Sequence, residues 1–216
     1  MATTKVVDVL DRASIILQDN SKVRYQNSEL LKFFNDAQKE VVLHRPDANM
    51  NNTAVDCVAG SKQSLPTDGL RLIDVVQNTG GRAVTQISRQ VLDETLPDWH
   101  TATGSTVLHF VYDAADPKNY YVYPQATANT DLDIIYSSAP ADIAIADFET
   151  DTTTITLDDI YANCILDYIL YRLYQKDSEY AGNPQRSMMH YQSFANALGI
   201  KTQADSATTP VPAVGV

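Results

Sequence analysis

The sequence predicts an α+β fold, a four-helix bundle formed by N- and C-terminal helical hairpins with an antiparallel β domain inserted between them. Apolar residues recur every three or four positions near both ends of the chain, as on one face of a helix. Between them lie short β-branched runs separated by Gly, Pro, Asp and Asn, which is typical of strands and turns. We therefore expect a helical bundle from 1–48 and 157–200, a β domain at 49–156, and a flexible tail at 201–216.

Two N-terminal helices are predicted from their apolar stripes. The stripe of the first, over 6–17, consists of Val6, Val9, Leu10, Ala13, Ile16 and Leu17. A polar link, 18–27, leads to Ser28, which suits a helix N-cap. The second helix keeps the helical period until Arg45 and Pro46 stop it.

Six strands are predicted in the middle of the chain. They cover 53–58, 70–77, 83–88, 106–112, 119–123 and 131–136. The links between them contain turn sequences, such as those at 67–69 and 79–81. These runs predict a small antiparallel sheet or sandwich.

A third helix begins after the strands, with Asp158 or Asp159 as its cap, and is expected to run to about Tyr180. Its inner face consists of Tyr161, Cys164, Ile165, Tyr168, Ile169, Arg172 and Leu173. It is the most apolar of the predicted helices, so we expect it at the centre of the bundle.

A fourth helix is predicted from Asn183 and Pro184, which suit the N-cap and the first helical position. Gly199 would close this helix as its C′ residue. The segment that follows, 201–216, is rich in Thr, Ala, Pro and Val and has no helical period. We expect it to be flexible in the isolated chain and to become ordered on a partner.

Charge and composition restrict the function classes. The chain of 216 residues has a formal net charge of -11, and its 16 basic residues are scattered rather than grouped. Tight binding of nucleic acid through its phosphates is therefore disfavoured, although an acidic wall would let a duplex slide past. The chain has no apolar run of about 18 residues and no signal peptide, so we expect no membrane span and a cytosolic site of synthesis.

No sequence motif of an enzyme or a metal site is present. The chain lacks a Gly-rich phosphate loop, a Gly-x-Ser-x-Gly elbow, a His-Glu-x-x-His and a Cys-x-x-Cys. The four histidines lie at unrelated positions: His44, His100, His109 and His190. Cys57 and Cys164 are expected to be buried free thiols. We therefore expect no catalytic residue, no metal site and no cofactor, and we interpret the chain as a protein that is not an enzyme.

A few aromatic and basic side chains are candidates for contact with other subunits. Tyr171 and Tyr174 belong to a tyrosine-rich stretch of the third helix, where core packing and contact with a neighbouring subunit are both open. Arg172 is either the ion-pair partner of an acid such as Asp177 or Asp36, or an interface anchor. Trp99, the one tryptophan, is either a core residue of the β domain or an interface anchor.

Seven phrases follow one another along the chain. They are ELLKFFNDAQKEVV (29–42), RPDA (45–48), GSKQSLP (60–66), LD (92–93), LPDWH (96–100), YYVYP (120–124) and DYILYRLYQKDSEY (167–180). Taken together, they resemble the head-to-tail adaptor, or connector, proteins of tailed bacteriophages. The segments before Gln26 and after Lys201 lie outside these phrases.

The resemblance implies a structural virion protein in the neck between capsid and tail, made in the host cytoplasm and acting without cofactor or membrane. It implies a twelve-subunit ring whose partners are the portal protein, a tail nozzle or tail tube protein, and further copies of the chain. Double-stranded DNA would pass through the bore without specific binding. The residues expected at interfaces are Trp99, Tyr171, Arg172, Tyr174, Lys201, Pro210 and Val216. We expect a monomer in dilute solution that forms the ring only on the portal.

Three other functions remain open at this point. The chain could be another neck or tail-completion protein, whose partners would be tail proteins alone. A hydrolase would need a cleft in which His100 or His109 meets two carboxylates of shifted pKa. A sugar- or receptor-binding module would need an exposed aromatic platform at Tyr120, Tyr121 and Tyr123, where the alternation instead favours one buried and one exposed face.

Overall fold

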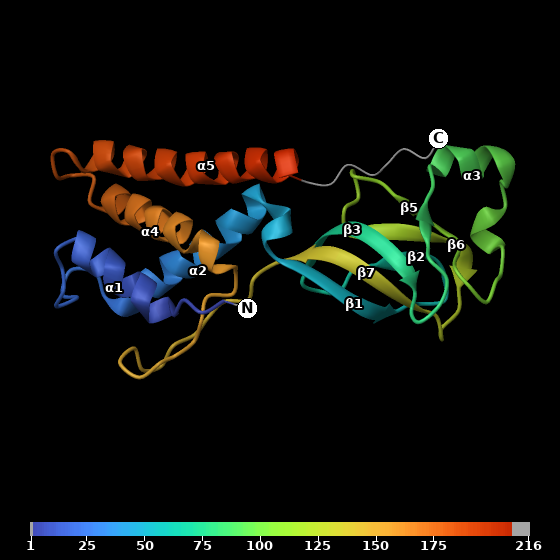
Figure 1. Cartoon of the computed structure of the whole chain (residues 1–216), viewed down its shortest axis with the longest axis horizontal. Helices are drawn as coiled ribbons and strands as arrows, with labels where there is room; N and C mark the ends of the chain where they lie inside the picture. Colours follow the sequence, from blue (N-terminus) through green and yellow to red (C-terminus); the bar gives the residue numbers. More distant parts are fainter. Residues whose placement is uncertain (1, 209–216) are drawn as a thin grey trace. The chain divides into compact units, whose positions relative to one another are not determined.

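The structure is a computed structural model that describes the backbone of residues 2–208 and the side chains of residues 2–199. The chain divides into two compact units. A helical unit combines the residues before Pro46 with those after Ala139, and a β unit is formed by Pro46–Ala139. In Figure 1 the blue and the orange to red helices belong to the helical unit, and the cyan to yellow strands belong to the β unit.

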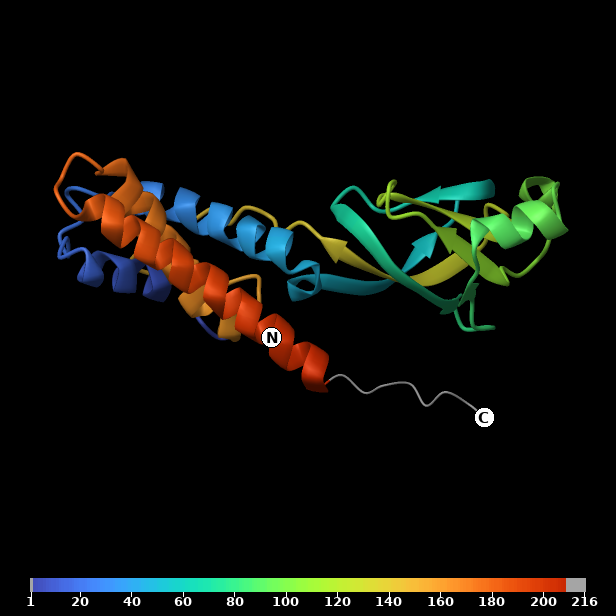
Figure 2. The same ribbon diagram turned by 90° about the horizontal axis from the view of Figure 1, so that it is seen from above.

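The helical unit contains four of the five α-helices found in residues 2–208. They are α1 (Val6–Ile16), α2 (Asn27–His44), α4 (Ala162–Lys176) and α5 (Asn183–Thr208). A short 3-10 turn, η3 (Asp159–Tyr161), precedes α4. Helix α4 packs against the other three, and it lies between α5 and the pair α1 and α2 in Figure 1. Seen from above in Figure 2, α5 runs obliquely to α2.

The interior of this unit is apolar and almost fully buried. It includes Val9, Leu10, Leu30, Phe34, Ile165, Ile169, Leu173 and Phe194. Helix α4 buries side chains around most of its circumference, because neighbouring helices cover it on several sides. This agrees with the central position that its apolar sequence predicts.

The segment 140–158 leads from the β unit to η3 and is attached to α2 by polar side chains. The side-chain amide of Asn35 donates to the carbonyl of Ile143 and accepts from its N–H, both at 3.0 Å. The backbone N–H of Thr156 donates to the side-chain oxygen of Gln38 at 2.9 Å. The two amides thus satisfy backbone groups that have no strand partner.

The β unit holds all seven strands found in residues 2–208. They are β1 (Met50–Asp56), β2 (Gly60–Ser64), β3 (Gly69–Asn78), β4 (Thr85–Gln86), β5 (His109–Tyr112), β6 (Asn119–Ala126) and β7 (Asp131–Ser138). One sheet has the order β1-β7-β3 and the other the order β2-β6-β5-β4. All neighbouring strands are antiparallel except β4 and β5, which are parallel.

A short helix and two 3-10 turns complete the β unit: α3 (Arg89–Thr95), η1 (Pro46–Ala48) and η2 (Trp99–Thr101). Its main core draws on both sheets and includes Leu72, Val75, Phe110, Tyr120, Val122, Leu132, Ile134 and Tyr136. The three β7 residues in this list are two positions apart, so they share one face of the strand. Each unit therefore has its own core.

The predicted fold class is wrong in its architecture, although the chain is α+β. Helices α1 and α2 each pack more closely on α4 than on one another, so they do not form a hairpin that faces a second hairpin. The described residues contain a fifth helix, α3, and a parallel strand pair, β4–β5, which the prediction of a purely antiparallel domain lacked. An apolar stripe identifies the buried face of a helix but not the element that buries it, and this is why the error arose.

Several element boundaries also differ from the predicted ones. The strand expected at 83–88 is reduced to Thr85–Gln86, and α3 follows it directly. That helix was not predicted because Leu92 is its one buried residue, which leaves no apolar period to detect. Helix α5 does not end at Gly199 but continues to Thr208. The segment 140–156, assigned to the β domain from the sequence, groups with the helical unit.

Candidate interaction surfaces

The α4–α5 face brings together two of the predicted interface residues, because α5 packs along α4. The ring of Tyr171 lies between Tyr168 and Tyr191, at centroid distances of 5.7 Å and 5.1 Å. Tyr171 is half-buried, whereas Tyr174 is only 8% exposed. Tyr174 stacks on His190 at 5.6 Å. Of these two tyrosines, Tyr171 is therefore the one that offers a surface.

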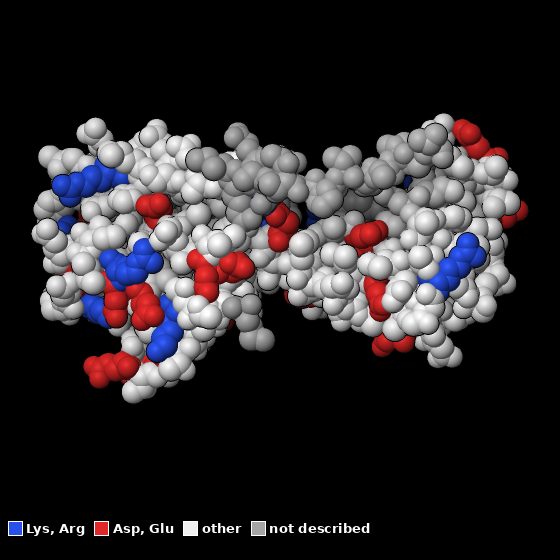
Figure 3. Space-filling model, viewed as in Figure 1, with Lys and Arg blue, Asp and Glu red and all other residues white. Residues whose placement is uncertain are grey.

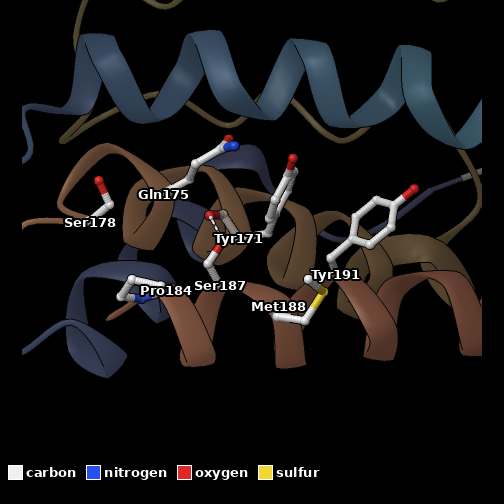
Figure 4. Close-up of a pocket in the computed structure, with 7 residues that line it drawn as sticks. All are labelled: Tyr171, Gln175, Ser178, Pro184, Ser187, Met188 and Tyr191. Atoms are coloured by element: carbon white, nitrogen blue, oxygen red, sulfur yellow. Dashed lines mark hydrogen bonds between the residues drawn. The ribbon is translucent and has the colours of Figure 1, made fainter. Parts of the chain in front are cut away.

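An open groove of about 420 Å³ follows this face. It is lined by Tyr171, Gln175, Ser178, Pro184, Ser187, Met188 and Tyr191. Figure 4 shows Tyr171 and Tyr191 on one side of the groove, with the hydroxyl of Ser187 donating to the carbonyl of Tyr171 at 3.1 Å. Met188 is 58% exposed and Tyr191 37% exposed. Neither residue was among the interface residues predicted from the sequence.

Arg172 lies on α4 beside aromatic rings. Its guanidinium is 5.6 Å from the centroid of Phe33 and donates to the hydroxyl of Tyr168 at 3.4 Å. Burial raises the pKa of Tyr168, and the nearby Arg172 charge opposes that rise. Asp177, one proposed partner, instead forms an ion pair with Arg24 at 2.9 Å. Arg172 is half-buried and joins α4 to α2.

Trp99 is buried in the β unit, with 1% of its surface exposed. Its indole N–H donates to Asp93 at 2.8 Å, and its ring stacks on His100 at 3.7 Å. Leu96, in the same loop, is 45% exposed. In the isolated chain Trp99 thus fills a small core beneath this loop, which is the position expected of a core residue.

The remaining predicted interface residues lie at the C-terminal end. Lys201 belongs to the last turns of α5, where the structure describes the backbone alone. Pro210 and Val216 lie outside the described residues. The predicted tail, 201–216, therefore begins as a continuation of α5.

The histidines of the β unit are bonded to hydroxyl groups. His100 is bonded to the hydroxyl of Ser61 at 2.9 Å, and His109 to that of Thr85 at 2.7 Å. In residues 2–199 no group of three or more His, Cys, Asp or Glu side chains could hold a metal ion. Burial, followed by the charges of nearby aspartates, raises the pKa of Cys57 to about 11, so this thiol stays protonated.

The aromatic run of β6 does not form an exposed platform. Tyr120 is 1% exposed, and burial raises the pKa of its hydroxyl. Tyr121 and Tyr123 are half-buried against the small core around Trp99. The strand alternates as the sequence predicts, but its second face is half-buried rather than exposed.

The surface of the helical unit carries charges of both signs close together, as Figure 3 shows for one face. Lys39 pairs with Asp142 and Lys176 with Glu29, both at 2.6 Å. No helix in residues 2–208 is long and apolar enough to cross a membrane. The basic side chains are thus dispersed among acids, as their scatter in the sequence suggests.

Comparison with known proteins identifies the class. The chain is a head-to-tail adaptor of a bacteriophage, a structural protein of the virion neck. More specifically, a family model described as SU10 adaptor protein matches residues 4–214, and the chain belongs to that family. The resemblance found in the sequence phrases is thereby confirmed. No curated protein sequence matches the chain.

Membership of this family implies a structural rather than a catalytic role, with portal and tail proteins as the partners. The match extends beyond the phrases at both ends, and it includes the start of α1 and most of the C-terminal segment. The segments that seemed to lie outside the resemblance are therefore part of the family's pattern.

Proposed function

We propose that this adaptor assembles into a closed ring of twelve copies that joins the portal to the tail nozzle or tail tube and lines the DNA channel. The single observation that carries the proposal is the family match over residues 4–214. The two separate cores add to it, because one chain can then present a helical surface and a β surface to different partners.

The charge of the chain supports a channel through which DNA moves. With a net charge of -11 the subunit repels phosphates, so a duplex in the bore would meet no strong electrostatic hold. Several lysine and arginine side chains of the helical unit form ion pairs with nearby acids, among them Lys39–Asp142 and Lys176–Glu29. A surface of this kind favours sliding over binding.

Two surfaces are proposed for protein contacts. The groove along α4 and α5 exposes Met188 and Tyr191 beside Tyr171, and such side chains are enriched where subunits meet. In the β unit, Leu96 and Pro97 lie over Trp99 and would form the contact, with Trp99 supporting them from below. We assign the first surface to the ring wall and the second to the tail.

The first test is the mass of the chain by light scattering, alone and then mixed with the cognate portal ring. We expect a monomer of 23.8 kDa that joins the portal in a fixed multiple near twelve. A chain that ignores the portal and binds tail proteins alone would instead be a tail-completion protein. A small closed dimer or trimer formed without the portal would rule out the ring.

The C-terminal segment is proposed to attach the adaptor to the portal. Deletion of 201–216 should leave the thermal unfolding of the monomer nearly unchanged, because the described cores lie outside this segment. Attachment to the portal should weaken, since the contacts made by this segment are lost. Co-sedimentation with the portal measures the effect, and unchanged attachment would remove the segment from the mechanism.

A further inference from the structure

The two sheets of the β unit are linked through the chain that joins β3 to β4. The N–H of Val84 donates to the carbonyl of Val76 at 3.1 Å, and Ala83 is bridged to Gln77. These contacts connect the last part of β3 to the chain that enters β4. Strand β1 is an edge of the sheet β1-β7-β3, and β2 is an edge of the sheet β2-β6-β5-β4.

The register of β1 shows which of its backbone groups do not bond to β7. The carbonyl of Asn49 accepts from the N–H of Ser138, and the N–H of Cys57 donates to the carbonyl of Thr130, both at 2.9 Å. In an antiparallel pair the bonded positions alternate, so the odd-numbered residues of β1 point their backbone groups toward β7. The even-numbered residues point theirs away from the sheet: Met50, Asn52, Ala54 and Asp56.

The edge of β1 also lacks the features by which proteins usually protect a free strand. The other edge of its sheet, β3, has three register shifts, and β4 is only two residues long. In contrast, the register of β1 is regular over all seven residues, with no proline, lysine or bulge. A regular and exposed edge of this kind is a site for pairing with another strand.

Strand β2, an edge of the other sheet, has outward backbone groups that can pair with those of β1. The N–H of Leu65 donates to the carbonyl of Lys118 at 2.9 Å, so Gln63 and Leu65 point toward β6. Lys62 and Ser64 therefore point their backbone groups outward. The bulge of β2 lies before Lys62 and leaves this part of the strand regular.

The two edges carry opposite charges at the positions where their backbone groups match. Asp56 is paired with Asp131 of β7, and partial desolvation, then the hydrogen bond and charge of Asp56, raise the pKa of Asp131. No lysine or arginine within residues 2–199 forms an ion pair with either carboxylate, and Lys62 has no ion-pair partner there. A lysine placed beside this acid pair would relieve the repulsion between its two members.

We propose that β1 of one adaptor copy pairs antiparallel with β2 of the next copy, with Asp56 opposite Lys62 and Ala54 opposite Ser64. In this register the outward groups of both strands face one another, and Lys62 lies on the outer face of the joined sheet beside Asp56 and Asp131. The contact extends the sheet from copy to copy.

A second copy of the chain is the partner of this edge because the two edge strands, β1 and β2, differ and carry complementary charges. Contacts between unlike surfaces repeat from head to tail, and they close into a ring when the rotation allows it. A pairing over so few residues is weak by itself, which agrees with a monomer that assembles only when the portal aligns the copies. The inference thus rests on the proposed ring and names one of its contacts.

The proposed pair of Asp56 and Lys62 is tested by reversing each charge alone and then exchanging the two. The measurement is the amount of ring formed on the portal. Asp56→Lys and Lys62→Asp should each weaken assembly about tenfold, because like charges then face one another across the contact. The double variant should restore assembly to within about twofold of the wild type. Lys118→Asp, a reversal in a turn of the same unit, is the control and should have no effect. Failure of the double variant to restore assembly would overturn the register.

The backbone contact is tested by amide hydrogen exchange on the unmodified chain. In the monomer the amides of Ala54 and Asp56 should exchange rapidly, while Thr53 and Val55 are protected by β7. In the ring Ala54 and Asp56 should become protected by at least tenfold, together with Lys62 and Ser64. Met50 lies beyond the proposed pairing, so its amide should still exchange rapidly in the ring and serves as an internal control.

The outcomes separate this inference from the proposed function. A ring of the expected mass in which Ala54 and Asp56 still exchange rapidly would overturn the strand pairing and leave the ring intact. Protection that appears only after tail protein is added would assign the edge to the tail and also overturn the inference. If the chain forms no ring on the portal, both proposals fail.

Discussion

Asp159 is a single carboxylate that fixes the start of the chain to η3. It accepts from the N–H of Thr3 at 2.9 Å, from the N–H of Thr4 at 2.8 Å, and from the hydroxyl of Thr3 at 2.7 Å. These bonds, led by that of the Thr3 side chain, hold the pKa of Asp159 far below its usual range. The sequence offered Asp159 only as a helix cap, because two segments so distant in sequence give no local signal.

The lowered pKa of Asp159 predicts a loss of stability in acid. A carboxyl group whose pKa falls on folding stabilises the native state above its unfolded pKa, about 3.9, and this contribution is lost as pH falls through the folded pKa. Asp159→Asn should therefore lower the melting temperature at pH 7 by a few degrees. The difference from the wild type should shrink as the solution is acidified below about pH 4.

Calorimetry over this pH range measures the effect. Glu179→Gln is a suitable control, since it removes an exposed carboxylate at the surface of the same unit. A difference between Asp159→Asn and the wild type that stays constant down to pH 2 would show that the carboxylate charge is not the cause.

At the scale of elements, α5 shows how a local signal can be overridden. A glycine near the end of an apolar period predicts a helix C′ residue with positive φ. Gly199 instead lies inside α5, and a Cβ built there would meet no atom within 4 Å. Gly182, in the turn before α5, has the positive φ of 92° that Gly199 lacks.

The two glycines give a matched pair of substitutions. Gly199→Ala should stabilise the chain by about 0.4–1 kcal/mol, because alanine restricts the unfolded chain and fits a helix. Gly182→Ala should destabilise it, because a side chain is strained at positive φ however open the space. Chemical denaturation followed by circular dichroism measures both. Destabilisation by Gly199→Ala would mean that the helix ends at this glycine after all.

The strands also have features that their local sequence does not predict. Alternation in β7, a strand predicted at 131–136, places Leu132, Ile134 and Tyr136 on one face. The three register shifts of β3 could not be predicted, since they depend on how the strand bends against β7. Whether an edge is free depends on strand order, which the pattern of a strand does not contain.

At the scale of the whole molecule, the β unit has the properties of an independent domain. Its first and last strands are neighbours, with Met50 opposite Ser137, so its two ends leave the sheet side by side. The side chain of Asn49 donates to the carbonyl of Ser138 at 3.0 Å and holds these ends together. A domain inserted through adjacent ends can be removed without cutting its core.

We therefore predict that the fragment 46–139 folds alone. It should unfold cooperatively, because its core draws on both sheets and on no residue of the helical unit. The longer fragment 49–156, bounded as the sequence suggested, is the comparison. Its extra residues, 140–156, should show no amide protection, since Asn35 and Gln38 are missing. A fragment 46–139 without a cooperative transition would show that this unit depends on the helices.

The sequence by itself determined the family and the positions of α1, α2, α4 and β7. These features depend on residues close together in the chain, on a period of 3.6 or 2, or on phrases that can be recognised directly. The structural role as an adaptor followed from those phrases and agrees with the family match.

The tertiary structure alone decided which elements meet. It placed α4 against three helices, buried Trp99 and Tyr174 while leaving Tyr171 and Met188 accessible, and left β1 and β2 as edge strands of the two sheets. Periodicity gives the direction in which a side chain points, but burial and pairing depend on residues far away in the chain. Contacts between distant residues therefore determine which surfaces remain for a partner.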